Sequence, residues 1–215
     1  MAGAFTPQLI AGLARYVRQA LGSADLDAAT VRRFEEPLSR LHPVRPPGGD
    51  GMRLPVMRDW DRALAGAPIV VRPLLAALGP ALVWARNPNY RSRPNPRFLA
   101  NYGYGVVLGP ADRRARPLVD DASASMGLLM LGPDVVYPRH RHPAEEIYIP
   151  LAGTAWWQRG DAPWRRVKPG SAIHHPPLMP HATRTGGDPL VALYIWQGEI
   201  ATHARLENVT AAERR

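Results

Sequence analysis

The sequence predicts a mainly β fold, an antiparallel sandwich or barrel, preceded by an α-helical extension. From about residue 99, short β-rich runs follow one another at close intervals and are separated by Gly, Pro and Asp. Before that point, apolar residues recur at helical spacing. We therefore expect a helical N-terminal extension over residues 1–98 that packs on the barrel, the β-barrel itself over residues 99–200, and a polar C-terminal tail over residues 201–215.

Three helical segments are predicted in the N-terminal region. Residues 6–21 begin with Thr6 as the N-cap and Pro7 at the first helical position, which is the usual order at a helix start. Residues 25–41 continue the helical spacing, with a proline inside the segment that is expected to break or kink it. A third segment, from about residue 60 to residue 84, is interrupted by several prolines.

The β region contains six runs that we expect to form strands. No long helical pattern separates them, and this close spacing favours an antiparallel sandwich or barrel over alternating β and α units. The six runs are YGYGVVLG, ASMGLLMLG, EEIYIPLAG, TAWWQ, SAIHH and PLVALYIWQG.

Composition limits the classes of protein and of site. The chain has 215 residues, 46% of them apolar and 21% charged, which is ordinary for a soluble globular protein. No segment has the apolar length of a membrane span, and the N-terminus lacks the layout of a signal peptide, so we expect a cytoplasmic protein without a membrane partner. The chain has no cysteine, which leaves His, Asp and Glu as the available metal ligands.

The net charge of +9 raises the question of a nucleic-acid partner. The arginines are scattered along the whole chain, and Lys168 is the only lysine, which indicates a compositional bias. No recognition-helix pattern or aromatic RNA-binding signature is present. We therefore predict no nucleic-acid partner, and expect a basic surface that suits a small anionic or zwitterionic substrate.

The densest polar cluster of the chain lies at the start of a predicted strand. His140, His142, Glu146 and Tyr148 share one parity, so in an extended backbone their side chains point to the same face. This shared face requires an extended backbone, and Pro143 favours a bend between the histidines and the glutamate. The cluster is followed at once by an apolar run, which favours a site on a barrel wall over a solvated loop.

His181, after a proline-rich turn, is a fourth candidate ligand, and Gly153 is expected to close the hairpin after the cluster. Three imidazoles and one carboxylate suit one divalent transition metal ion, such as Zn, Fe, Mn, Co or Ni, and leave room for a substrate. Glu145 is an alternative to its neighbour as the carboxylate ligand, although its parity is unfavourable. Whether His174 or His175 also contacts the metal stays open.

The spacing of these residues resembles two motifs of the cupin family. The first motif has a longer gap after its first glycine than usual, and the second has a late histidine and lacks the usual asparagine. The segments HPAEEIYIPLAGTAWW, PG…HHPPLMPHA and PLVALYIWQG further resemble the cupin dimethylsulfoniopropionate (DMSP) lyases over roughly residues 100–200. The two motifs read Gly132…His140-x-His142-x3-Glu146-x6-Gly153 and Pro169-Gly170…His181.

The resemblance implies a cupin double-stranded β-helix, or jelly-roll barrel, and a metal-dependent β-elimination of DMSP to dimethyl sulfide and acrylate. It implies Tyr148 as the catalytic base and Tyr137 close to the substrate, with Tyr194 as a further candidate for the pocket. Trp156 or Trp196 would offer an aromatic face to the sulfonium group. The implied metal ligands are His140, His142, Glu146 and His181.

Two other functions remain compatible with the same motifs. A cupin isomerase, dioxygenase or decarboxylase acting on another small carboxylate would use the same ligand set. A non-catalytic cupin that senses a ligand would need no catalytic tyrosine, and the N-terminal region lacks the helix-turn-helix that often accompanies such sensors. The barrel edges and the apolar helical extension are compatible with a homodimer.

Overall fold

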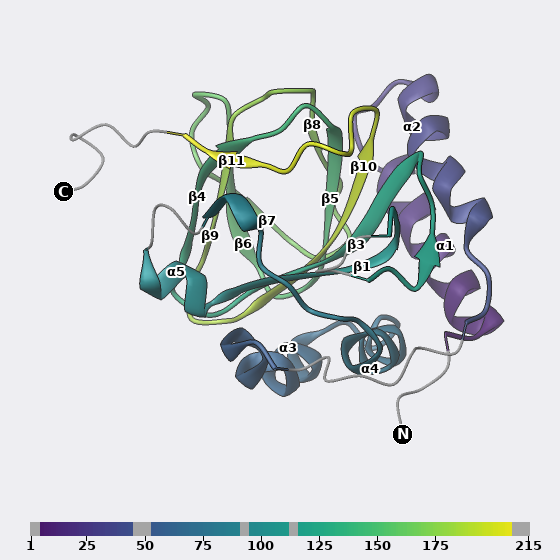
Figure 1. Cartoon of the computed structure of the whole chain (residues 1–215), viewed down its shortest axis with the longest axis horizontal. Coiled ribbons are helices and arrows are strands. Elements are labelled where there is room, and N and C mark those ends of the chain that lie inside the picture. Colours follow the sequence, from purple (N-terminus) through teal and green to yellow (C-terminus); the bar gives the residue numbers. More distant parts are fainter. Residues whose placement is uncertain (1–4, 45–52, 91–94, 112–115, 208–215) are drawn as a thin grey trace.

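The computed structural model describes residues 5–44, 53–90, 95–111 and 116–207, and it consists of a β-barrel flanked by helices (Figure 1). The barrel is built from two sheets. The first has the strand order β2-β1-β3-β10-β5-β8 and the second has the order β11-β4-β9-β6-β7. The strands are β1 (Tyr102–Gly109), β2 (Val119–Asp120), β3 (Ala124–Leu131), β4 (Val136–Arg141), β5 (Glu145–Ala152), β6 (Ala155–Arg159), β7 (Arg165–Val167), β8 (Ile173–His175), β9 (His181–Thr185), β10 (Leu190–Gln197) and β11 (Arg205–Leu206).

The chain passes repeatedly from one sheet to the other. The consecutive strands β4, β5 and β6 alternate between the two sheets, and every pairing except that of β1 with β2 is antiparallel. This is the jelly-roll arrangement of a cupin barrel. Gly153 therefore occupies a corner between the two sheets instead of the predicted hairpin. Gly153 has a φ of +77°, a left-handed conformation that favours glycine. A Cβ at this position would also lie 2.1 Å from the backbone carbonyl oxygen of Pro189.

The helical extension begins as the sequence predicts. Thr6 caps the first helix by accepting a hydrogen bond from the backbone N–H of Leu9, and Pro7 is its first residue. The second α-helix ends at Glu35, and a 3-10 helix containing Pro37 continues from it, so the predicted break is confirmed. The α-helices are α1 (Pro7–Gly22), α2 (Ala28–Glu35), α3 (Trp60–Gly66), α4 (Arg72–Ala81) and α5 (Pro96–Ala100), and the 3-10 helices are η1 (Glu36–Arg40), η2 (Pro55–Asp59) and η3 (Pro88–Tyr90).

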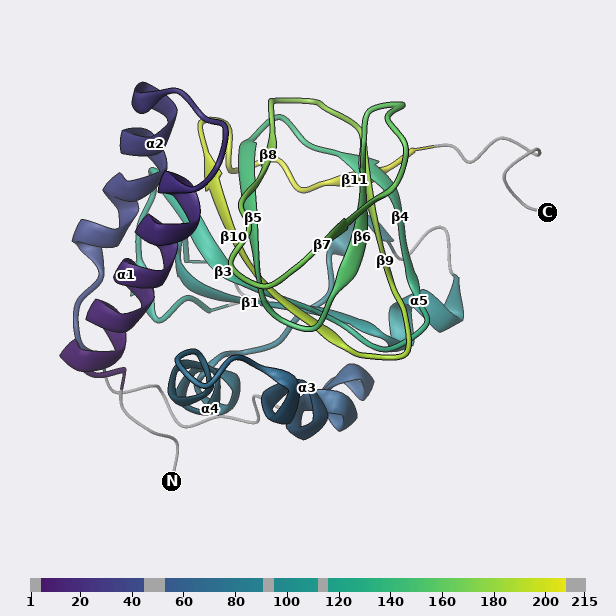
Figure 2. The same ribbon diagram turned by 180° about the vertical axis from the view of Figure 1, so that it is seen from behind.

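The large sheet is buried on both faces, which divides the interior into two cores. Odd-numbered residues of β5 and β10, such as Ile147 and Leu193, pack in one core with Val17 and Leu75 of the helices. Even-numbered residues of the same strands, such as Tyr194, face a second core inside the barrel. The helices α1 and α2 lie along one flank of the barrel, and α3 and α4 lie across its end (Figures 1 and 2). The helices thus cover the outer face of the sheet that carries part of the site.

The C-terminal segment differs from the predicted peripheral tail. Residues 205–206 form β11, which pairs with the end of β4. Ala204 is buried, and its carbonyl oxygen accepts a hydrogen bond from the side chain of Asn87. Residues 201–207 are therefore part of the barrel wall, whereas residues 208–215 lie outside the described residues.

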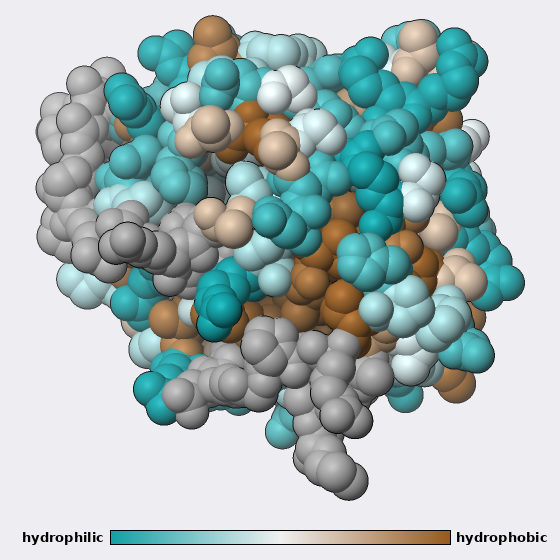
Figure 3. Space-filling view, turned by 45° about the vertical axis from the view of Figure 1, so that its right-hand side comes forward, coloured by the Kyte–Doolittle hydropathy of each residue, from teal (hydrophilic) through white to brown (hydrophobic). Residues whose placement is uncertain are grey.

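On the face shown in Figure 3, hydrophilic side chains cover much of the surface, and hydrophobic side chains gather most densely near the middle. Within the described ranges, the helices are all too short or too polar to cross a membrane.

Candidate metal centre and active site

Three buried side chains place potential ligand atoms close together inside the barrel. His142 follows the end of β4, Glu146 is the second residue of β5, and His181 begins β9. One ligand atom from each of the three lies within 4.8 Å of the other two. The bend at Pro143 carries the chain from one sheet to the other, and the even-numbered side chains on both sides of it still face the interior. The barrel therefore brings together three of the four expected ligands.

The backbone fixes the orientation of the histidine rings. The Nδ1 atom of His142 lies 2.9 Å from the carbonyl oxygen of Ala144, and that of His181 lies 2.9 Å from the carbonyl oxygen of Met179. A carbonyl oxygen can only accept, so each Nδ1 carries the proton. In the neutral ring, Nε2 then presents its lone pair, and this is the arrangement found for histidines that bind a metal.

The carboxylate of Glu146 lies at the centre of this group. Its Oε2 atom is 3.2 Å from Nε2 of His142 and 3.2 Å from Nε2 of His181, while Oε1 accepts a 2.6 Å hydrogen bond from the indole of Trp196. Burial would raise the pKa of Glu146, but the neighbouring histidines, His142 above all, lower it well below its ordinary value. A buried carboxylate surrounded by imidazole nitrogens is a donor set that fits a divalent metal.

His140, the fourth expected ligand, lies beside this group. Its ring centroid is 4.1 Å from that of His181, and its Nδ1 also points to a backbone carbonyl oxygen, that of Pro138, at 2.8 Å. Burial lowers the pKa of His140 well below its ordinary value, which keeps the ring neutral and its Nε2 available. His140 therefore has the same tautomer as the other two histidines and lies beside the group, and its role as a fourth ligand stays a prediction.

The structure also separates the two histidines of β8. His174 faces outward, where its Nε2 lies 2.7 Å from a carboxylate oxygen of Glu145, and Glu145 in turn pairs with Arg33 of α2. His175 is fully buried, and its Nδ1 lies 3.2 Å from Oε2 of Glu146. Its Nε2 is buried without a hydrogen-bond partner among the described residues. Of the two, His175 is thus the one that contacts the site.

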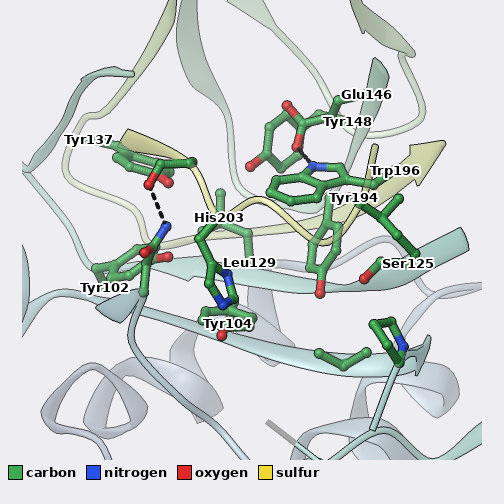
Figure 4. A pocket seen from close by; sticks show the side chains of 15 residues that line it. Tyr102, Tyr104, Ser125, Leu129, Tyr137, Glu146, Tyr148, Tyr194, Trp196 and His203 are labelled. Atoms are coloured by element: carbon green, nitrogen blue, oxygen red, sulfur yellow. Dashed lines mark hydrogen bonds between the residues drawn. The ribbon is translucent and has the colours of Figure 1, made fainter. Parts of the chain in front are cut away.

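A small cavity of about 100 Å³ adjoins the candidate ligands. Figure 4 shows aromatic side chains from several strands around it, with Glu146 and Trp196 at one side. The described residues that line it include one carboxylate and no arginine or lysine, so the wall suits a compact molecule that carries a positive charge. The lining comprises Asn87, Tyr102, Tyr104, Val106, Pro110, Ser125, Leu129, Tyr137, Glu146, Tyr148, Tyr194, Trp196, Ile200, His203 and Ala204.

Tyr148 and Tyr194 reach this cavity from neighbouring strands. They form a directly opposed pair in the register of β5 and β10, and Gly127 on β3 lies opposite Tyr194 on its other side. A Cβ at Gly127 would come within 2.6 Å of the Tyr194 hydroxyl and 2.1 Å of a backbone oxygen, so glycine makes space for the phenol. Burial first, and then the charge of Glu146, raise the pKa of Tyr148 well above its ordinary value.

Tyr137 joins the cavity to the histidine cluster. Its ring stacks on His140 with centroids 4.0 Å apart, and its hydroxyl lies 2.6 Å from that of Tyr90. Burial raises the pKa of Tyr137 well above its ordinary value, so its hydroxyl is a hydrogen-bond donor at neutral pH. Tyr137 can therefore hold a ligand in the cavity without carrying charge.

The two tryptophans expected near the substrate have different positions. Trp196 lines the cavity and stacks against His142, with ring centroids 4.2 Å apart. Trp156 lies elsewhere, under the guanidinium groups of Arg166 and Arg184, because it faces away from the buried side of β6. Trp156 is therefore not among the described residues that line the cavity, since alternate residues of a strand face opposite sides.

Several cavity residues are not predicted by any motif. Asn87 and His203 come from segments outside the six expected strands, and Ser125 lies on β3 among apolar residues. The only sequence signal for Ser125 is a single hydroxyl in an apolar run. His203 has no signal, because its place in the wall depends on the return of the C-terminal segment along β4.

The fold and the buried histidine–glutamate group define a cupin with a candidate metal centre. The family model for dimethylsulfoniopropionate lyase matches residues 28–192. Since this match covers most of the chain, the chain belongs to the DMSP lyase family.

Individual relatives agree with this assignment. The curated DMSP lyase DddQ of Ruegeria pomeroyi is 35% identical over 132 residues, which represent 61% of this chain and 63% of that relative, so the alignment spans less than two thirds of either. The crystal structure of the same Ruegeria pomeroyi DMSP lyase DddQ superposes with a TM-score of 0.69 at 26% identity, covering 94% of this chain and 97% of that chain. A chain from the crystal structures of the DMSP lyases RdDddP and RnDddQII superposes with a TM-score of 0.67 at 23% identity. The superposition covers 94% of this chain and 98% of that chain, and it shows the shared fold.

Proposed function

We propose that the protein is a metal-dependent lyase that cleaves DMSP by β-elimination to dimethyl sulfide and acrylate. The observation that carries the proposal is that Glu146, at the centre of the histidine–glutamate group, and Tyr148 both line one small aromatic cavity. Family membership and the activity named for the Ruegeria relative support the same reaction. The ligands proposed for one divalent transition metal ion, such as Zn, Fe, Mn, Co or Ni, are His140, His142, Glu146 and His181.

The cavity fits the charge distribution of DMSP. The substrate carries a sulfonium at one end and a carboxylate at the other. Aromatic faces of Trp196 and Tyr194 can hold the sulfonium, because a ring attracts a cation through its quadrupole. No arginine or lysine competes for the carboxylate among the described lining residues, so the carboxylate is directed towards the ligand cluster and the hydroxyl of Tyr137.

Tyr148 is proposed to remove the proton from the carbon next to the substrate carboxylate. The C–H electron pair then forms the double bond of acrylate, and the C–S bond breaks to release neutral dimethyl sulfide with the electron pair on sulfur. The leaving group needs no proton, so one base is sufficient. Without a metal, the pKa of Tyr148 is raised well above its ordinary value, so its hydroxyl stays protonated at neutral pH. An added positive charge nearby is therefore needed for the phenolate to form.

A divalent metal bound by the proposed ligands would supply that charge, and would polarise the substrate carboxylate as a Lewis acid. The protein residues determine where the proton goes. Tyr148 lies two positions after Glu146 on the same face of β5, so the strand itself fixes the distance between the base and the ligand cluster. Trp196 holds Glu146 through its indole N–H and so orients the carboxylate.

The proposed function can be tested by headspace detection of dimethyl sulfide from purified protein of measured metal content. The active protein, given DMSP, is expected to release sulfide, and His142→Ala is expected to lose both the metal and the activity. His42→Ala is the matched control, because His42 is exposed and remote in sequence from the candidate ligands. Absence of sulfide from wild-type protein that carries a full complement of metal would contradict the proposal.

A further inference from the structure

A second, larger hollow is lined by residues on and around β7 and β8, the edge strands of the two sheets. Figure 2 shows where these two strands lie. The volume of the hollow is about 640 Å³, and none of the described residues that line it belongs to the tyrosine-lined cavity. We call this hollow the edge groove. Its lining comprises Ala24, Asp25, Leu26, Trp157, Arg159, Ala162, Pro163, Arg165, Arg166, Val167, Lys168, Ser171, Ala172, Ile173 and His174.

Positive charge is concentrated in the edge groove. Arg159, Arg165, Arg166 and Lys168 all line it, and Asp25 is the single carboxylate among its described lining residues. No ion pair joins any of these four cations to a described residue. Burial, and then the like charge of Arg165, lower the pKa of Arg159. Such a set of cations is stabilised by a bound anion.

The inner wall of the edge groove is apolar. Trp157 is 2% exposed, and Leu26, Val167 and Ile173 contribute further apolar surface. The indole Nε1 of Trp157 is buried and has no acceptor among the described residues. Trp157 also packs near Tyr148, which lines the tyrosine-lined cavity, with ring centroids 6.4 Å apart. The groove thus combines unpaired donors with an apolar surface.

We propose that the edge groove binds a small organic anion that carries two or more phosphate groups. Guanidinium groups match phosphate oxygens with paired hydrogen bonds. Arg166 lies over the ring of Trp156, and the three other cations of the groove, Arg159, Arg165 and Lys168, exceed what a single carboxylate requires. A volume of about 640 Å³ is larger than an inorganic anion fills, and the apolar wall accommodates the organic part of the ligand. This site is separate from the proposed metal centre and does not depend on the reaction proposed for it.

Isothermal titration calorimetry with inorganic pyrophosphate and with adenosine diphosphate tests the proposal. Both probes are expected to bind wild-type protein, with the nucleotide tighter, because it adds contacts with the apolar wall. Arg159→Gln/Arg165→Gln is expected to weaken both at least tenfold. The matched control is Arg116→Gln/Arg205→Gln, which removes the same charge at or beside β2 and β11, the opposite edges of the two sheets, and is expected to change affinity less than twofold.

Two further variants keep the result interpretable. His142→Ala is expected to retain probe binding, which separates the edge groove from chelation at the metal centre. Arg165→Lys, which keeps the charge, is expected to retain binding within a few fold, and circular dichroism verifies the fold of each variant. The proposal is overturned if wild-type protein binds neither probe, if both double variants lose affinity equally, or if only His142→Ala loses it.

Discussion

The candidate metal centre depends on one carboxylate and on the tautomers of the histidines around it. Glu146 is fully buried, and such a charge is unfavourable unless partners compensate it. Backbone carbonyl oxygens hold the Nδ1 protons of His140, His142 and His181, which turns the three Nε2 atoms inward. This arrangement of imidazole nitrogens around a buried carboxylate is a donor set that could hold a metal ion.

The role of Tyr148 yields a prediction at the same scale. Tyr148→Phe removes only the hydroxyl and keeps the ring that packs in the barrel core. We expect elimination to fall by at least about a hundredfold, as for loss of a general base. Bound metal and the circular dichroism spectrum should be unchanged, as measured by metal analysis beside the sulfide assay. Near-normal turnover in this variant would remove Tyr148 from the mechanism.

His175 yields a prediction about pH. Burial lowers its pKa to about 3, so the ring is neutral in the folded protein, whereas in the unfolded chain it titrates near about 6.5. As the pH falls below about 6.5, this ring takes up a proton in the unfolded chain but not in the folded protein. The free energy of unfolding therefore decreases progressively between about pH 6.5 and pH 3. For the metal-free protein this amounts to about 2 kcal/mol between pH 7 and pH 5. His140, whose pKa is also lowered by burial, acts in the same direction.

Urea unfolding of chelator-treated protein at pH 7 and pH 5 measures this effect. His175→Gln should reduce the loss of unfolding free energy on acidification, whereas His42→Gln, at an exposed position, should leave it unchanged. An equal pH dependence in wild type and His175→Gln would contradict the account of His175 as a buried neutral ring.

At the scale of elements, the strands of the large sheet serve two cores at once. One face of β3, β5 and β10 packs under the helices and the other face lines the barrel interior. This explains why these strands are almost continuously apolar, since neither face meets water. The few polar side chains on the inner face, Glu146 and Ser125 among them, are therefore concentrated at the cavity.

Gly127 on β3 provides a test of this arrangement. A Cβ at this position would meet a backbone oxygen at 2.1 Å and the Tyr194 hydroxyl at 2.6 Å, so Gly127→Ala should destabilise the protein by about 2 kcal/mol and displace the phenol. Gly12→Ala is the matched control, because no atom lies within 4 Å of its added Cβ and alanine favours a helix by about 1 kcal/mol. Thermal unfolding compares the two, and an unchanged midpoint for Gly127→Ala would contradict the predicted clash.

At the scale of the whole molecule, the candidate ligands join elements that are distant in sequence. His142 follows β4 in the small sheet, Glu146 belongs to the large sheet, and His181 opens β9 of the small sheet. A metal that binds only the folded protein would link the two sheets and stabilise the fold by mass action.

Metal addition should therefore raise the unfolding temperature of chelator-treated protein. At a free concentration one hundred times the dissociation constant, the stabilisation is about 2.7 kcal/mol, or about 5–10 °C for a chain of this size. Titration with Zn, Mn, Co, Ni and Fe(II) in a thermal-shift assay would also rank the metals. The shift should vanish in His142→Ala/His181→Ala and persist in His42→Ala, and an equal shift in all three proteins would exclude this site.

Local sequence determined most of the elements. The start of α1 at Thr6 and Pro7 and the strands β1, β3, β5, β6, β8 and β10 could be predicted because capping and apolar alternation are encoded within a few residues. The strands β2, β4, β7, β9 and β11 are not among the six predicted runs, since they are short or polar and are stabilised by their partners across the sheet. The ligand cluster could be predicted because parity and spacing survive the bend at Pro143.

Only the tertiary structure decided which side chains share the site. It turned His175 inward and His174 outward, placed Trp196 at the cavity and Trp156 away from it, and brought His203 into the wall. The sequence by itself determined the residue types and their spacing along each strand, which local backbone geometry converts into faces. Which faces meet depends on the path of the chain between the two sheets, a long-range property that no local pattern contains.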